Sequence, residues 1–281
     1  MAPSMSASKI TATLLAVLAT FPSLTASVSI GSFQNRSLPI WAPTTGTTWQ
    51  IVLNADNVDA SVRVQAIDVD VFDNTAAKIA SLKKSGKKVI CYFSAGSYED
   101  WRSDAGSFVD DDLGDELDGW PGEYWLDTNS ANVRKVMATR MDLAVKKGCD
   151  AIDPDNVDAY DNDGGGLGLD EDDATSYTTF LAATAHSKGL AIGLKNAGDI
   201  ITPGLVAKFD FAINEQCLVY NECATWQPFL DAKKPIFHIE YPSTAPKVSA
   251  AAKKKICSNA SRKSFSTVLK LEALDNWMLT C

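Results

Sequence analysis

The feature that most limits the fold of this chain is a junction that recurs four times, in which a lysine-containing segment runs directly into a short apolar segment. The junctions are 81–86 before 89–93, 144–148 before 149–152, 186–189 before 190–194 and 231–235 before 236–239. Lysine is favoured in the last turn of a helix, and the glycine that ends three of these segments suits the left-handed residue after a helix. Each junction therefore indicates a helix that ends and a buried strand that begins. Their alternation predicts an α/β protein.

The strand candidates are short and apolar on both faces, which is typical of buried parallel strands. They lie at 49–53, 66–71, 88–93, 124–126, 151–153, 190–194, 209–213, 236–239 and 265–269. About eight such units in roughly 250 residues favour a (β/α)8 TIM barrel over an open doubly wound sheet, with 265–269 as an extra strand. No linker divides the chain, so we expect a single domain over 49–281, preceded by an N-terminal arm over 28–48.

Residues 1–27 have the pattern of a secretory signal peptide. Lys9 precedes an apolar run over 10–21, and small residues around Ala26 form a cleavage site. The run is too short to span a bilayer. We therefore expect a secreted, extracellular protein whose mature form is not attached to a membrane.

Six cysteines fit this location, since an even number in an oxidising compartment usually forms disulfides. The pairs expected are Cys217–Cys223, Cys257–Cys281 and, from the remainder, Cys91–Cys149. A zinc site is the alternative, but the chain has no C-x-x-C spacing and only two histidines. Residues 161–172 match a calcium loop poorly, so the sequence predicts no metal and no cofactor. Glycosylation sequons begin at Asn35 and Asn259.

The charge of the chain is acidic and unevenly distributed. Lys+Arg 26 against Asp+Glu 35 gives a net charge of -9, which argues against nucleic acid or an anionic membrane as partner. Acids crowd 99–118, where the only base is Arg102, and 150–173, which contains no base. Both stretches fall on loops at one end of the predicted barrel, so we expect a cleft for a cationic ligand. A solvated acidic surface is the alternative.

Catalytic residues of such a barrel gather where its strands end. The predicted strand ends are rich in carboxylates, and Asp155 and Glu215 stand directly at two of them. Helix capping explains many acids at such positions, but not readily these two. The chain has no G-x-S-x-G, H-E-x-x-H or P-loop motif, and two histidines do not favour a Ser–His–Asp triad. Two carboxyls without a cofactor are what glycoside hydrolysis requires.

A series of motifs at these strand ends has a recognisable order. The motifs are Trp49–Gln50, Asp68–Val69–Asp70, KVICYFSAGS at 88–97, DPDNVD at 153–158, GLKN at 193–196 and NEQC at 214–217. Together they resemble the fungal endo-α-1,4-polygalactosaminidases of glycoside hydrolase family 114 over about 49–241. The resemblance implies a (β/α)8 barrel, secretion, and hydrolysis of α-1,4-linked galactosamine in a cationic polysaccharide, and this substrate agrees with the acidic loops.

Position by position, the resemblance implies a catalytic pair formed by Glu215 and an aspartate of the 153–158 motif. We assign Asp155, which stands at the strand end, and keep Asp153 and Asp158 as alternatives. Trp125 is an aromatic candidate for stacking on a sugar. Substrate contacts are expected from Asp70, Tyr92, Asp158, Lys195, Asn196 and Glu240.

Two other functions stay open at this point. A non-catalytic polysaccharide-binding barrel would keep the acidic cleft without turnover. A glycosidase acting on neutral α-galactosides would have no special use for that acidity.

Overall fold

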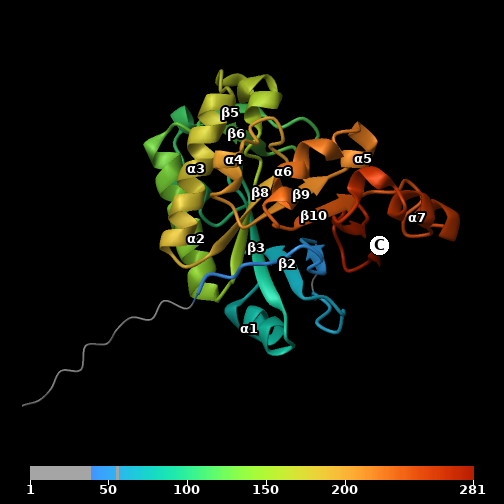
Figure 1. The fold of residues 1–281 in the computed structure, drawn as a ribbon. Coiled ribbons are helices and arrows are strands. Elements are labelled where there is room, and N and C mark those ends of the chain that lie inside the picture. The colour runs from blue at the N-terminus through green and yellow to red at the C-terminus, as the bar shows by residue number, and fades with distance from the viewer. Residues whose placement is uncertain (1–38, 55–56) are drawn as a thin grey trace, which may run out of the picture. The chain divides into compact units, whose positions relative to one another are not determined.

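The computed structural model describes residues 39–54 and 57–281, and its centre is a curved parallel sheet (Figure 1). Eight strands follow one another in the order β1-β2-β3-β7-β8-β9-β10-β11, and every neighbouring pair is parallel. The strands are β1 (Trp49–Val52), β2 (Ala66–Asp70), β3 (Lys88–Ser94), β7 (Ala151–Asp155), β8 (Ala191–Lys195), β9 (Phe211–Glu215), β10 (Ile236–Glu240) and β11 (Ser266–Leu269). This is the strand order of the predicted (β/α)8 barrel.

The first and last strands of this series meet at the C-terminal segment. There β12 (Leu279–Thr280) pairs antiparallel with β11, and the backbone N–H of Leu53 donates to Leu274 O at 2.9 Å. The indole N–H of Trp49 in β1 also donates to Ser266 O in β11 at 2.7 Å. The extra strand is therefore β12. Residues 265–269, predicted as the extra strand, instead supply the eighth barrel strand, because β11 pairs in parallel with β10.

Helices follow most of the strands and cover the outside of the sheet (Figure 1). They are α1 (Ala76–Lys84), α2 (Ala131–Lys147), α3 (Glu171–Ser187), α4 (Pro203–Val206), α5 (Cys217–Tyr220), α6 (Gln227–Asp231) and α7 (Ala250–Cys257). As the junctions predicted, α1 ends on two lysines, and α2 is followed by left-handed Gly148 with a φ of 89°. Between β1 and β2, the described residues form no helix. Within 39–54 and 57–281, no helix is long and apolar enough to cross a membrane.

A small antiparallel sheet is inserted between β3 and α2. It consists of β4 (Ser97–Glu99), β5 (Leu113–Glu116) and β6 (Glu123–Leu126), in the order β4-β6-β5. The segment 124–126, predicted as a barrel strand, lies in β6, and that prediction was wrong because β6 pairs only with β4 and β5. Since β4 begins directly after β3 ends, this sheet stands at the carboxyl end of the barrel.

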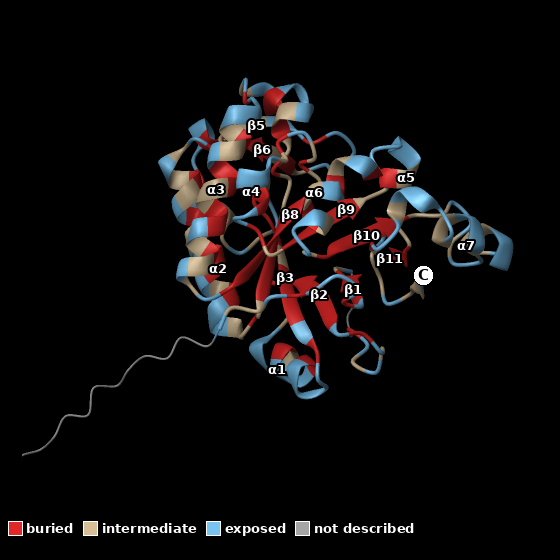
Figure 2. Cartoon of the chain, in the orientation of Figure 1, coloured by how far each residue is buried: buried red, intermediate tan, exposed pale blue. Residues whose placement is uncertain are grey.

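The eight barrel strands are buried almost throughout (Figure 2). Inside the barrel, Trp49 stacks on Phe237 with ring centroids 4.9 Å apart, and Phe211 packs beside Phe237. The lumen also contains Ile51, Ala66, Ile90, Ala151, Ala191, Ile213, Ile239 and Val268. Because side chains alternate between the two faces of a strand, the residue two places after an inward apolar residue faces the lumen as well. At the carboxyl ends of most strands the last inward-facing residues are polar, as at Asp70, Tyr92 and Glu215.

All six cysteines are oxidised in the predicted pairs. The disulfides are Cys91–Cys149, Cys217–Cys223 and Cys257–Cys281. The first joins Cys91 in β3 to Cys149, which lies just before β7, the strand beside β3 in the sheet. The predicted signal peptide at 1–27, the sequon at Asn35 and the arm before residue 39 lie outside the described residues, whereas the sequon at Asn259 is exposed.

Candidate active site

Six polar side chains form the top layer of the barrel lumen, each near the carboxyl end of a different strand. They are Asp70, Tyr92, Asp155, Lys195, Glu215 and Tyr241. Each stands two places after a residue of the layer beneath, so the period of the strand itself aims them inward. All six line one cavity of about 720 Å³. Five of them belong to the predicted site, and the predicted Asn196 and Asp158 line the same cavity.

Lys195 is the buried centre of this group. Its Nζ lies 3.3 Å from Asp155 Oδ1, 3.5 Å from Glu215 Oε2 and 3.5 Å from Asp153 Oδ2. Burial alone would lower the pKa of Lys195, but the three carboxylates outweigh it and raise that pKa well above the ordinary value. A permanent ammonium therefore bridges both residues of the predicted catalytic pair.

Glu215 is held by donors on both of its oxygens. The amide of Asn196 donates to Oε2 at 2.9 Å, and the hydroxyl of Tyr241 donates to Oε1. Burial would raise the pKa of Glu215, but Lys195, followed by the Tyr241 and Asn196 hydrogen bonds, lowers it. Glu215 is thus a carboxylate in the free protein at neutral pH.

Two further carboxyls, Asp68 and Asp153, lie one layer deeper and are fully buried. Apart from their mutual contact, none of their four oxygens receives a hydrogen bond within the described part of the chain. Burial, together with the charge of Asp153, raises the pKa of Asp68 well above its usual value. Asp68 therefore keeps a proton and can donate it to Asp153. Asp153 in turn faces Lys195, so this pair supports the cation from below.

The backbone turns sharply after three of the charged residues. Asn156, Asn196 and Gln216 have positive φ angles of 58°, 49° and 61°, and they directly follow Asp155, Lys195 and Glu215. Asparagine tolerates the left-handed region better than most residues, and such conformations concentrate at functional sites. The amide of Asn156 also donates to Glu123 Oε1 at 3.1 Å.

Glu123 is a cavity carboxyl that was not among the residues predicted from the sequence. It comes from β6 and accepts a hydrogen bond from Ser97 in β4. Burial raises the pKa of Glu123 to about 7, and the charges of Glu99 and Asp155 act in the same direction. The small sheet thus adds to the cavity a carboxyl that is partly protonated near neutral pH.

Arg102 contacts a second group of carboxylates that lines the cavity. Its Nη2 lies 2.7 Å from Asp70 Oδ2 and 2.7 Å from Glu99 Oε1. Asp70 also accepts the backbone N–H of Phe72 at 2.7 Å, so the hydrogen-bonding capacity of this predicted substrate contact is largely used within the protein.

Asp158, another predicted substrate contact, has a raised pKa. Burial, with the charge of Asp155 nearby, raises the pKa of Asp158 to about 6.

The acidic stretches divide into cavity residues and structural residues. Glu99, Asp155 and Asp158 line the cavity. Asp112 instead accepts hydrogen bonds from Ser130 and Asn132 at 2.6 Å, and Asp170 caps α3. The cleft is therefore acidic, but fewer of the clustered acids face it than the sequence suggested.

Two predicted contacts do not reach the cavity. Glu240 is buried, and its Oε1 accepts from His238 Nε2 at 2.9 Å and from the backbone of Leu218 at 3.0 Å. The cause is strand alternation, since Glu240 and inward-facing Tyr241 point to opposite faces of β10. Trp125 is also buried and packs against Leu117 and other apolar residues. We withdraw both as substrate contacts.

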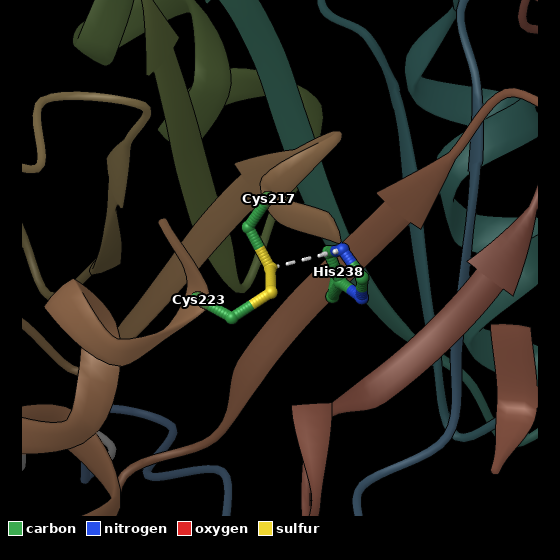
Figure 3. A group of neighbouring side chains, drawn as sticks. All are labelled: Cys217, Cys223 and His238. Atoms are coloured by element: carbon green, nitrogen blue, oxygen red, sulfur yellow. Dashed lines mark hydrogen bonds between the residues drawn. A yellow bond between two sulfur atoms is a disulfide. The ribbon is translucent and has the colours of Figure 1, made fainter. Parts of the chain in front are cut away.

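The chain after Glu215 is fixed by a disulfide, with His238 against one of its sulfurs (Figure 3). Cys217 Sγ lies 3.4 Å from His238 Nε2, and Cys217 is bonded to Cys223. Within the described residues, these three form the only cluster of His, Cys, Asp and Glu close enough to hold a metal ion. Disulfide sulfurs are not thiolates, which are the sulfur ligands that zinc requires. The cluster is therefore a brace for the loop that follows Glu215.

The chemistry available here is acid–base and nucleophilic catalysis by carboxyls. Asp155 and Glu215 both contact Lys195 in the cavity. The carboxyls around them differ in pKa, since that of Glu215 is lowered and that of Glu123 is raised. In such an arrangement one carboxyl can protonate the leaving oxygen of a glycosidic bond. The other can attack the anomeric carbon, or deprotonate a water molecule that attacks it.

Comparison with known proteins gives a consistent result. A model of glycoside hydrolase family GH114 matches residues 32–281. The crystal structure of Aspergillus fumigatus Ega3 in complex with galactosamine is 49% identical and covers 88% of this chain and 100% of that chain, with a TM-score of 0.82. The glycoside hydrolase domain of PelA from Pseudomonas aeruginosa shares the fold, with a TM-score of 0.63 at 12% identity over 85% of this chain and 99% of that chain. A search of curated proteins finds no match.

Proposed function

This chain belongs to glycoside hydrolase family GH114, and from that premise we propose that it cleaves α-1,4-linked galactosamine within a cationic polysaccharide. The structure of Ega3, 49% identical, was determined with galactosamine. The observation that carries the proposal is the pairing of Asp155 and Glu215 across Lys195 inside an acidic cavity.

We propose that the pair retains the anomeric configuration, because the contact that both carboxyls share with Lys195 keeps them close together. Retaining glycosidases hold their two carboxyls about 5–5.5 Å apart, and inverting enzymes about 6.5–9.5 Å. Lys195 Nζ lies 3.3 Å from Asp155 Oδ1 and 3.5 Å from Glu215 Oε2, so the distance between these two oxygens is at most the sum of the two contacts, which excludes all but the lower edge of the inverting range. In the mechanism we propose, one carboxylate attacks the anomeric carbon as the other carboxyl protonates the leaving oxygen. The second group then deprotonates the water that releases the sugar.

The charge of the cavity supports an amino sugar as substrate. Its acidic lining residues are Asp70, Asp73, Glu99, Glu123, Asp155, Asp158, Glu215 and Glu272. The basic lining residues are Arg102 and Lys195, and both already contact carboxylates. The excess negative charge attracts the ammonium group of a deacetylated galactosamine, whereas a neutral galactoside gains nothing from it.

Hydrolysis of a defined polymer tests this function. The purified protein is incubated with partly deacetylated α-1,4-galactosamine polymer, with the fully acetylated polymer and with a neutral α-galactoside, and products are followed by mass spectrometry. We expect internal cleavage of the first, giving mixed oligosaccharide lengths. Binding without products would support the polysaccharide-binding barrel, and cleavage of only the neutral substrate would support the α-galactosidase.

We also propose that the protein is secreted and acts outside the cell without a cofactor. The signal-peptide pattern at 1–27, three disulfides and an exposed sequon at Asn259 support this location. Sequencing the N-terminus of protein recovered from the medium tests it, because cleavage near Ala26 should remove the first segment.

A further inference from the structure

Two tryptophans are exposed on the described part of the chain. Trp101 has an exposed fraction of 54% and Trp120 of 62%, whereas the other five tryptophans are buried or half-buried. Leaving two indoles in water forgoes the stabilisation that their burial would provide. A pair of large exposed aromatic residues therefore points to a ligand that covers them.

Both tryptophans line the same cavity as Asp155 and Glu215. They come from the small antiparallel sheet and not from the barrel, since Trp101 follows β4 and Trp120 lies in the turn between β5 and β6. No hydrogen bond or ion pair within the described residues joins either side chain to the Lys195 cluster. They thus form a wall of the cleft that is separate from the catalytic group.

The backbone holds the two residues in place. The N–H of Asp100 donates to Gly122 O at 3.1 Å, which ties the Trp101 segment to the Trp120 turn. Trp120 N donates to Leu117 O at 3.0 Å, and Glu123 N donates to Trp120 O at 3.1 Å. Within the part of the chain that the structure describes, neither indole stacks on another aromatic ring. Both indoles are therefore largely exposed on a backbone that is already ordered.

An exposed carboxylate lines the same cavity as this aromatic wall. The side chain of Asp73 is 71% exposed and lines the same cavity, and apolar Leu117 lies there as well. A pyranose ring with an ammonium group matches this combination, because its C–H bonds pack on an indole face while the cation meets carboxylates and the aromatic π-system. A neutral sugar would use only the first of these contacts.

We propose that Trp101 and Trp120 form a sugar-binding subsite for an amino-sugar unit of the polymer that is not the unit being cleaved. This inference rests on the proposed function, since the occupant is another ring of the same substrate. Because a remote subsite binds the ground state and the transition state alike, its loss raises KM and leaves kcat nearly unchanged. A substrate too short to reach the subsite is insensitive to it.

The test uses Trp101→Ala and Trp120→Ala in the full-length secreted protein, each with its Phe variant. Tyr220→Ala is the matched control, because Tyr220 is 66% exposed on α5 and does not line the cavity. KM and kcat are measured on the cationic polymer and on galactosamine di- and trisaccharides. We expect each Ala variant to raise KM on the polymer roughly tenfold, with partial recovery in the Phe variant. The control and the short substrates should show no change.

Product lengths give a second measurement, since loss of the subsite should shift the oligosaccharide distribution. Unchanged polymer KM and product lengths in both Ala variants would overturn the inference. If the wild-type protein itself fails to cleave the polymer, the proposed function fails instead. Titration calorimetry of a galactosamine pentasaccharide into the wild-type protein and the Ala variants then decides the subsite, and equal affinities would reject it.

Discussion

The hydroxyl of Tyr241 donates a hydrogen bond to Glu215, so the residue that follows β10 helps Lys195 to keep the carboxylate at the end of β9 ionised. The neighbouring strands β9 and β10 are in parallel register, and this places both side chains in the top layer of the lumen. Lys195 and Asn196 approach the same carboxylate from β8. Three strands thus determine the charge of one group.

Tyr241→Phe should make the protein require a higher pH for activity. Removal of the donor raises the pKa of Glu215, so the acidic limb of the kcat/KM profile should move up by about one pH unit. A depressed carboxyl pKa also contributes folding stability above the ordinary glutamate value, which is lost as the pH falls. The loss of Tm in the variant should therefore be larger at pH 7 than at pH 3. Tyr220→Phe is the control, and identical limbs in the two variants would contradict the assignment.

Asp155→Asn and Glu215→Gln should each lower kcat by at least about 10³-fold, because each removes a proton-transfer or nucleophilic role. Both substitutions are nearly isosteric, so Tm should change little. Stopped assays on the cationic polymer measure the rates, with exposed Asp110→Asn as control. The pair would be rejected if either variant kept a rate near that of the wild type.

Lys195→Met should destabilise the fold as well as abolish activity. It leaves Asp153, Asp155 and Glu215 without their shared cation, and loss of one partner of a buried ion pair costs about 3–5 kcal/mol. Adding Asp153→Asn removes the most deeply buried of these carboxylates and should restore part of the stability but none of the turnover. Urea unfolding and kcat measured on the same samples test both parts. A double variant no more stable than Lys195→Met would show that Asp153 carries no charge that needs compensation.

Asp68→Asn should be tolerated, whereas Asp68→Val should not. A protonated Asp68 donates one hydrogen bond to Asp153, and the amide of asparagine can donate in its place. Valine leaves the buried Asp153 without that donor, at a cost of about 1–3 kcal/mol. Thermal unfolding ranks the two variants, and infrared spectroscopy should show a protonated carboxyl band that is weaker in Asp68→Asn than in the wild type. The opposite order of Tm values would mean that Asp68 is ionised.

Salt should weaken activity on the cationic polymer, because ions screen attraction beyond a Debye length of about 8–10 Å. Asp73→Asn and Glu272→Gln, both at the cavity, should raise KM and reduce this salt dependence. Asp110→Asn and Asp111→Asn remove the same number of charges from exposed positions outside the cavity and serve as the matched control. Kinetics across a salt series compare the pairs. Equal effects of both pairs would assign the attraction to the net charge of the protein and not to the cleft.

The sequence identified the strand ends well because a buried parallel strand is a local pattern. Asp155, Lys195 and Glu215 each terminate such a strand, and the structure brings them together. The choice of Glu240 over Tyr241 was off by a single residue, and strict alternation from inward-facing Phe237 would have corrected it. Glu123 could not be predicted from the sequence, because its position in the cavity depends on strand pairing within the inserted sheet, and no local sequence pattern indicates that pairing.

Asp68 was part of a quoted motif, but its role was not visible in the sequence. Whether a carboxyl at that position keeps its proton depends first on its burial and then on the charge of Asp153, which lies on a strand far along the chain. The two exposed tryptophans were missed for a related reason, since only tertiary structure shows that β4 and the β5–β6 turn border the same cavity as the barrel.

The left-handed residues Asn156, Asn196 and Gln216 mark the boundary between the barrel strands, which must be kept, and the loops that follow them, which can be replaced. Up to these three residues, strand pairing determines where each charged side chain stands, and beyond them the loops begin from a set direction. A loop graft that starts after the left-handed residue can therefore alter which chain lengths the barrel accepts while leaving the charged centre in place. A graft that starts one residue earlier would replace the turn itself. For laboratory evolution, these three residues mark where the scaffold ends and the library can begin.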